Sequence, residues 1–173
     1  MPVRRAMGVR TVFNMLGPLS NPASPPFQVV GAFSLHAAEL MAHALSGMNI
    51  QRAFVVHGAL GWDEATPIGP YDLFDVTAGR VVHERRDPQE VGIDRCTAED
   101  LAGGDVAYNA RALEALLRGV PGAYQDASCL AAALTLEVSG MAADLRAAVE
   151  LARAAIADGR TARLLDAVRG LRE

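Results

Sequence analysis

The chain has 173 residues, of which 51% are hydrophobic and 21% are charged. This balance excludes a disordered chain and is sufficient for one domain with a buried core. The formal net charge of −4 argues against a protein that binds nucleic acid by general electrostatic attraction, and the longest apolar stretch, residues 127–136, is too short to span a bilayer.

The first segment combines three arginines, Arg4, Arg5 and Arg10, with the turn-forming dipeptides Gly17-Pro18 and Asn21-Pro22. A proline disfavours the helical conformation at the residue before it. We therefore expect a short basic helix or turn that leads into a rigid loop. Such a loop can present an arginine to a small anion.

Residues 27–58 have the pattern of a βαβ unit. Residues 27–34 are short, apolar and bounded by prolines, which predicts a buried strand. Ser34 is a suitable N-cap for a helix over residues 35–46 that ends at Gly47. Residues 53–58 predict a second buried strand, and a strand–helix–strand order predicts that the two strands are parallel.

Residues 71–77 and 80–85 alternate between apolar and polar residues around Ala78-Gly79, which predicts a hairpin at the edge of the sheet with one face exposed to solvent. Residues 87–93 are expected to form a turn that includes one helical turn. Beyond them, Thr97-Ala98-Glu99-Asp100 resembles a capping box that opens a helical region.

Four helices are expected in this C-terminal region. The segment Gly103-Gly104-Asp105 follows no strand, so it is expected to cap a helix that ends near Arg118, not to bind phosphate. Residues 123–138 are apolar almost all round, which predicts a buried helix. Residues 142–157 and 161–171 are amphipathic, and their predicted core positions are Leu145, Val149, Leu151, Leu164, Leu165 and Val168.

Together these elements predict one α/β domain over residues 1–173, with a partial, mostly parallel sheet, a βαβ unit, an edge hairpin and a C-terminal set of helices. Cys96 and Cys129 are far apart and fit no metal-binding spacing, so we expect reduced thiols in a cytoplasmic protein. The arginines near Met1 are followed by no apolar segment of the kind found in a secretory signal.

The loop after the second strand is the expected place for chemistry. Ligands in open α/β sheets gather beyond the carboxyl ends of the strands, and the second strand ends at His57-Gly58, shortly before Asp63 and Glu64. Carboxylates supply the hard oxygen ligands that Mg²⁺ prefers. Adjacent side chains diverge, so this pair is expected to hold Mg²⁺ together with water and substrate oxygens.

One long motif at the start of the chain resembles the signature of the anthranilate phosphoribosyltransferase family (glycosyltransferase family 3). Its residues are Arg4-x-x-x-Gly8-x-Arg10-Thr11-x-Phe13-Asn14-x-Leu16-Gly17-Pro18-Leu19-x-Asn21-Pro22. The resemblance continues to the C-terminus. It implies the C-terminal part of a nucleoside phosphorylase/phosphoribosyltransferase-type catalytic domain, and transfer of phosphoribosyl from phosphoribosyl pyrophosphate to anthranilate in tryptophan biosynthesis.

The resemblance also implies roles for individual residues. Arg4 would contact the carboxylate of anthranilate, although residue chemistry alone favours a solvated basic segment there. Gly17 and Pro18 would line the same pocket, with an ordinary turn as an equal alternative. Asp63 and Glu64 would engage Mg²⁺ on the pyrophosphate of the donor. No residue is assigned as a catalytic acid or base, because an aromatic amine is already a nucleophile, and a lone histidine such as His57 is more often structural.

Several family features have no match in these 173 residues. The glycine-rich donor loop is not found, the sequence contains no lysine, and the N-terminal helical domain that forms the family's homodimer has no counterpart. Ala131 stands where the family usually has Asn. We therefore expect activity only as part of a longer chain. The alternatives are a non-catalytic remnant, a half-protein that needs a separate N-terminal half, or a relative that binds nucleic acid, which the acidic balance disfavours.

Overall fold

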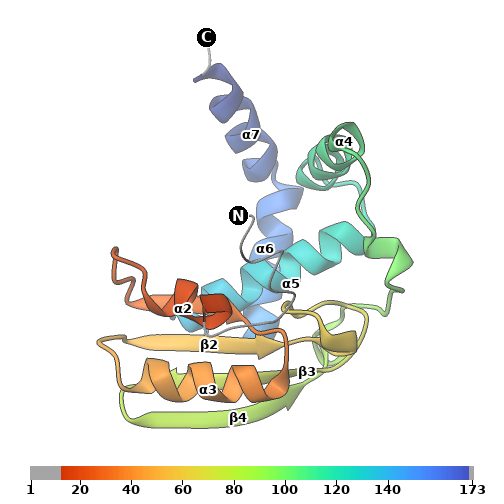
Figure 1. Cartoon of the computed structure of the whole chain (residues 1–173). Helices are drawn as coiled ribbons and strands as arrows, with labels where there is room; N and C mark the ends of the chain where they lie inside the picture. The colour runs from red at the N-terminus through yellow and green to blue at the C-terminus, as the bar shows by residue number, and fades with distance from the viewer. Residues whose placement is uncertain (1–12, 172–173) are drawn as a thin grey trace, which may run out of the picture.

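A computed structural model describes residues 13–171, which form a sheet with helices on both faces (Figure 1). The strand order is β1-β2-β3-β4. Helix α3 packs on one face of the sheet, and α5 and α6 lie on the other. The helices and strands are α2 (Phe13–Leu19), β1 (Phe27–Gly31), α3 (Leu35–Ser46), β2 (Arg52–His57), β3 (Tyr71–Thr77), β4 (Arg80–Arg86), α4 (Val106–Leu117), α5 (Ala123–Val138), α6 (Leu145–Ala157) and α7 (Arg160–Gly170).

The predicted βαβ unit is confirmed, since β1 and β2 are parallel neighbours joined through α3. The Ser34 hydroxyl accepts a hydrogen bond from the Ala37 N–H at 3.1 Å, which satisfies one of the free donors at the start of α3. Gly47 ends the helix. The contact positions of α3 include Ala37, Ala38 and Ala42, whose small side chains let the helix lie close to the sheet.

The predicted hairpin is also confirmed. β3 and β4 are antiparallel neighbours, and Thr77 pairs with Arg80 across a turn in which Gly79 has a φ of +70°. β4 lies at an edge of the sheet. Because the hairpin adds two antiparallel pairs to the single parallel pair, the sheet over the described residues is mixed, and the expected mostly parallel character holds for the βαβ unit alone.

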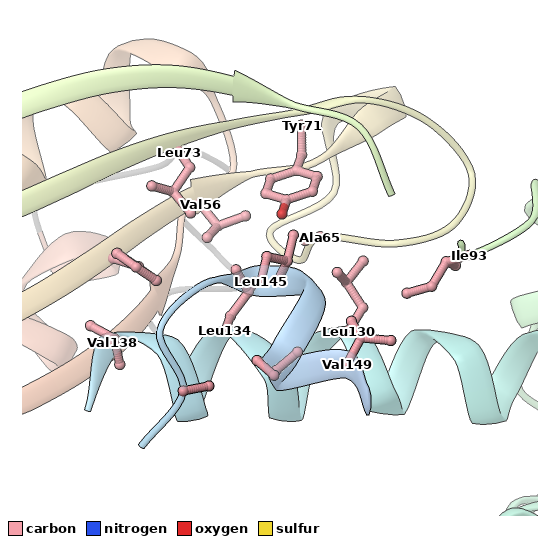
Figure 2. Close-up of a cluster of buried hydrophobic side chains, with 14 residues drawn as sticks. Val56, Ala65, Tyr71, Leu73, Ile93, Leu130, Leu134, Val138, Leu145 and Val149 are labelled. Carbon is pink, nitrogen blue, oxygen red and sulfur yellow. The ribbon is translucent and has the colours of Figure 1, made fainter. Parts of the chain in front are cut away.

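Two buried clusters hold the layers together. Figure 2 shows the cluster between the sheet and helices α5 and α6, where Tyr71 and Val56 from the strands face Leu134 and Leu145 from the helices. The second cluster lies between the sheet and α3. Alternate residues of β2 enter opposite clusters, as the period-two geometry of a strand requires.

Three burial predictions were wrong. β1 was expected to be buried, but Phe27 and Val29 are 36% and 39% exposed, because within residues 13–171 β1 has a strand on only one side. α5 has the predicted bounds but is buried along one face only, with Ala131 and Ala132 exposed on the other. The predicted core positions Leu151, Leu164 and Val168 are exposed.

Leu164 and Val168 are exposed because α7 lies with α4 away from the sheet, as Figure 1 shows. Charged contacts join these two helices: Arg118 bonds Asp166, and Arg169 bonds Glu114. Leu145 and Val149 of α6 are buried, as predicted.

Within residues 13–171, no helix is both long enough and apolar enough to cross a membrane. The two cysteines are free: Cys129 is buried, and Cys96 is partly exposed. Burial raises the pKa of the Cys129 thiol, which disfavours the reactive thiolate.

Candidate functional site

A cavity of about 550 Å³ lies between the end of α2 with the loop that follows it and strand β1. Gly17 and Pro18, both predicted as pocket residues, line this cavity. Of the polar side chains that line it with them, Asn21 belongs to the family motif, whereas no pattern in the sequence singled out Ser20 or Gln28. The further lining residues are Ser20, Asn21, Pro22, Pro25, Gln28, Val29, Val30 and Gly31.

The local conformation of Gly17 and Pro18 differs from the prediction. They were expected to form a turn, but they lie within the last turn of α2, and the loop starts at Ser20. Pro18 has no N–H, so it cannot donate a hydrogen bond within the helix, and its ring clashes with the preceding turn. Ser20 then satisfies the free end of the helix, since its hydroxyl donates to the carbonyl of Leu16 at 2.5 Å.

The acidic loop follows β2 as predicted. It begins at Gly58, forms a 3₁₀ turn over Ala59–Gly61 and reaches Asp63 and Glu64. The Gly58 N–H donates to the carbonyl of Trp62 at 2.8 Å and closes the loop. Leu60, at its tip, has a φ of +59° and is 75% exposed, a left-handed conformation that costs about 1–2 kcal/mol for such a residue.

Two glycines let the acidic loop approach the strand ends. A Cβ added to Gly31 would stand 1.9 Å from the backbone oxygen of Asp63, and a Cβ added to Gly58 would stand 1.9 Å from the backbone oxygen of Glu64. No side chain fits at either distance. Gly31 also lines the cavity, so the acidic loop lies directly against one of the cavity's lining residues.

The side chains of Asp63 and Glu64 are exposed, and no described residue pairs with either carboxylate. Free carboxylate oxygens suit Mg²⁺. The described residues contain no group of three or more histidine, cysteine or acidic side chains that could enclose a metal. The pair therefore fits a metal that takes its other ligands from water or substrate.

His57 joins the two strand ends. Its Nδ1 lies 2.9 Å from the carbonyl of Ala32, the residue after β1. A carbonyl only accepts, so Nδ1 carries the proton in this contact. The Ala32 N–H in turn donates to Val56 at 2.8 Å. His57 thus has the structural role that the sequence favoured.

Arg4 lies outside the described residues, as do Arg5 and Arg10, so its role in the site stays a prediction. The Gly103-Gly104-Asp105 segment is structural, as expected. The Asp105 carboxylate accepts from the Tyr108 N–H at 2.7 Å at the start of α4. Asn109 closes the turn with two hydrogen bonds to Gly104.

An ion-pair network that the sequence did not predict fastens the sheet to α5. Arg86 of β4 donates to Glu137 at 2.7 Å, and Glu137 is only 6% exposed. Burial lowers the pKa of Arg86, but hydrogen bonds to Glu137 and Glu84 outweigh burial and raise it overall. Arg52 forms a two-bond contact with Asp75 nearby. These partners are up to 51 residues apart, so no local pattern reveals them.

Comparison with known proteins gives one family. The model described as glycosyl transferase family, a/b domain, matches residues 1–162. Anthranilate phosphoribosyltransferase of Azorhizobium caulinodans is 44% identical over 165 residues, which cover 95% of this chain and 48% of that protein. The chain spans about half the length of the curated relatives it matches.

Solved structures agree with this similarity. Anthranilate phosphoribosyltransferase from Thermus thermophilus has 40% identity and a TM-score of 0.83, over 95% of this chain and 49% of that one. The Saccharomyces cerevisiae enzyme in complex with PRPP and Mg has 25% identity and a TM-score of 0.83, over 95% and 47% of the two chains.

Proposed function

This chain belongs to the glycosyl transferase family whose a/b domain matches residues 1–162, and from that premise we propose that it contributes the C-terminal half of an anthranilate phosphoribosyltransferase. The reaction is displacement at the anomeric carbon of phosphoribosyl pyrophosphate by the amine of anthranilate. One observation carries the proposal: Gly31 lines the cavity and also contacts the backbone of Asp63. An acceptor in the cavity and a donor held by the acidic loop would therefore be neighbours.

On the acceptor side, the cavity would hold anthranilate. Gly17 and Pro18 supply a wall without long side chains, which suits a flat aromatic ring. Arg4 would bind the carboxylate, because a guanidinium can donate two parallel hydrogen bonds to it. The cavity volume of about 550 Å³ is sufficient for one small aromatic acid.

On the donor side, Asp63 and Glu64 would hold Mg²⁺. When bound, the metal would stabilise the negative charge that develops on the leaving diphosphate. The chain would contribute two exposed carboxylates that no described residue pairs with, on a loop whose backbone lies against Gly31 of the cavity. The close approaches at Gly31 and Gly58 fix the backbone that carries them.

No described residue needs to act as a strong base. The amine of anthranilate is a nucleophile before it loses a proton, so alignment of the two substrates would supply most of the rate enhancement. His57 already uses Nδ1 to join the strand ends. We propose that the protein works in the cytoplasm on soluble small molecules.

The alternative is a half-protein that needs a separate N-terminal half, or a remnant without activity. The chain covers only about half the length of its relatives, which supports this alternative. Both proposals predict no turnover by residues 1–173 alone, but a half of the enzyme should gain turnover when the N-terminal half is added, whereas a remnant should not. Mixing the chain with phosphoribosyl pyrophosphate, Mg²⁺ and anthranilate should give no phosphoribosyl anthranilate without the rest of the family fold. Turnover by residues 1–173 alone would contradict the half-protein proposal.

Calorimetry with anthranilate tests the acceptor site. The unmodified chain should bind it, and Arg4→Ala should weaken binding about 10-fold or more, the effect of losing a charged hydrogen-bonding pair. Arg111→Ala, on the exposed surface of α4, is the matched control and should leave binding unchanged. Equal affinities for the Arg4→Ala variant and the unmodified chain would refute the role of Arg4.

A further inference from the structure

A second cavity lies among the four C-terminal helices. Its volume is about 500 Å³, and α4, α5, α6 and α7 all contribute residues to its wall. Figure 1 shows α4 and α7 on the far side of α5 from the sheet. This helical cavity shares no lining residue with the cavity beside β1. Its volume lies in the range of about 300–1,000 Å³ that is usual for sites that bind small organic molecules.

Most of the wall of the helical cavity is apolar. Leu116 of α4 and Cys129 of α5 are buried parts of it. Leu151 of α6 and Met141, in the turn before α6, are large apolar residues that stay 46% and 71% exposed. The thioether of methionine adapts its shape to a neighbouring surface. The wall therefore suits a hydrocarbon or aromatic body, which would cover Leu151 and Met141.

The charge of the wall comes from the start of α7. Among the lining residues, Arg160 is the only charged one. Its Nε and its backbone N–H donate to the Asp158 carboxylate at 2.8 and 3.1 Å, and its two terminal nitrogens have no partner among the described residues. Arg163 donates to the carbonyl of Asp158. Two guanidinium groups thus lie beside one carboxylate at the positive end of the α7 dipole, which favours an anion there.

The apolar and the cationic parts of the wall are at opposite ends. Leu136 and Met141 lie where α5 gives way to α6, whereas Arg160 and Thr161 follow the other end of α6. α6 has 13 residues, which span about 20 Å at 1.5 Å per residue. An elongated apolar cavity with one cationic end is complementary to a molecule that has an apolar body and a terminal acid group.

We propose that the helical cavity binds an organic anion, an aromatic or long-chain carboxylate. Its acid group lies at Arg160 and the start of α7, and its apolar body extends along α6 toward Met141. The inference goes beyond the proposed function, since it involves neither the cavity beside β1 nor the acidic loop.

Two fluorescent probes test the cavity. 8-Anilinonaphthalene-1-sulfonate carries an anion in place of the carboxylate, and N-phenyl-1-naphthylamine is its neutral counterpart. Residues 1–173 should bind one molecule of either probe per chain. Ala132→Trp fills part of the cavity and should weaken the binding of both probes about 10-fold or more. Ala131→Trp is the matched control, because Ala131 is equally exposed on α5 but does not line the cavity, and it should leave both affinities unchanged.

Arg160→Gln tests the cationic end. It should weaken the sulfonate probe about 3- to 5-fold, the effect of losing a solvent-exposed charge pair, and leave the affinity for the neutral probe unchanged. Cys129 supplies a separate readout in a Cys96→Ser background. Either probe should slow the reaction of the Cys129 thiol with a disulfide reagent about 5-fold or more, because access limits this reaction. Circular dichroism and melting temperature verify that the variants fold.

Four results would overturn the inference. They are equal affinities of Ala132→Trp and Ala131→Trp, an equal response of the two probes to Arg160→Gln, unchanged reactivity of Cys129 in the presence of probe, or a dimer in sedimentation that the probes dissociate. The last result would make the cavity an interface between two copies of the chain. Neither probe experiment needs anthranilate or Mg²⁺, so loss of anthranilate binding with intact probe binding would refute the proposed function alone.

Discussion

Replacing Gly31 by alanine should displace the acidic loop while the rest of the fold persists. The new Cβ would lie 1.9 Å from the backbone oxygen of Asp63, and that oxygen has to move by about 1.1 Å to reach even 3.0 Å. The shift falls on backbone atoms, which cannot rotate away as the end of a side chain can. Overpacking of this kind costs about 1–3 kcal/mol of stability.

The displacement should be visible in two measurements. In thermal unfolding, a domain of this size loses about 2–4 °C per kcal/mol. The backbone amide resonances of Asp63 and Glu64 should shift, while those of α7, which packs against α4 and α6 away from the sheet, should not. If the proposed function holds, a misplacement of about 1 Å also lowers the rate of the assembled enzyme by roughly 100-fold.

Gly47→Ala is the matched control, since a Cβ at Gly47 would meet only the Ala44 oxygen, at an ordinary 3.6 Å. It should leave the amide resonances of the acidic loop in place. The reasoning is refuted if Gly31→Ala melts at the temperature of the unmodified chain and leaves the Asp63 resonance unchanged, because the close approach would then not constrain the loop.

Three further predictions concern stability. Leu60→Asn should stabilise the chain by about 1 kcal/mol, because asparagine tolerates the left-handed conformation better than leucine; a thermal melt that shows no gain contradicts this. Arg86→Met should cost about 3–5 kcal/mol, because it leaves the Glu137 carboxylate buried without its partner, and adding Glu137→Leu should recover most of the loss in urea unfolding. Hydrogen bonds from Arg95 and from the Gln89 N–H lower the pKa of Asp87 below its ordinary 3.8. The stability from Asp87 is therefore present above pH 3.8 and lost as the pH falls through the lower, folded-state value, so Asp87→Asn should weaken the chain at pH 6 and have a smaller effect as the pH falls below 3.8.

The sequence predicted the elements whose signals are local. Ser34 and Asp105 both cap the helices they were expected to cap, and the Ala78-Gly79 turn joins the predicted hairpin. The position of Asp63 and Glu64 after β2 follows from strand order, so it too was predictable.

Burial was predicted poorly, because it depends on what lies on the other side of an element. The apolar pattern of β1 is that of a central strand, yet within the described residues it is an edge. Leu164 and Val168 have core-like spacing, but α7 lies against α4 and not against the sheet. The contact of Gly31 with Asp63 joins residues 32 positions apart, and only the fold brings them together.

The three residues between β1 and α3 connect the ends of the two parallel strands to the start of helix α3, so a change in α3 can be transmitted to the strand ends. Ala32 is bound to both Val56 and His57, and Ser34 caps α3. α3 in turn lies on the sheet through side chains as small as Ala38. A bulkier residue on the buried face of α3 would move the helix away from the sheet and displace residues 32–34. If the proposed function holds, variants that change substrate preference should therefore be sought on α3 as well as around the cavity itself.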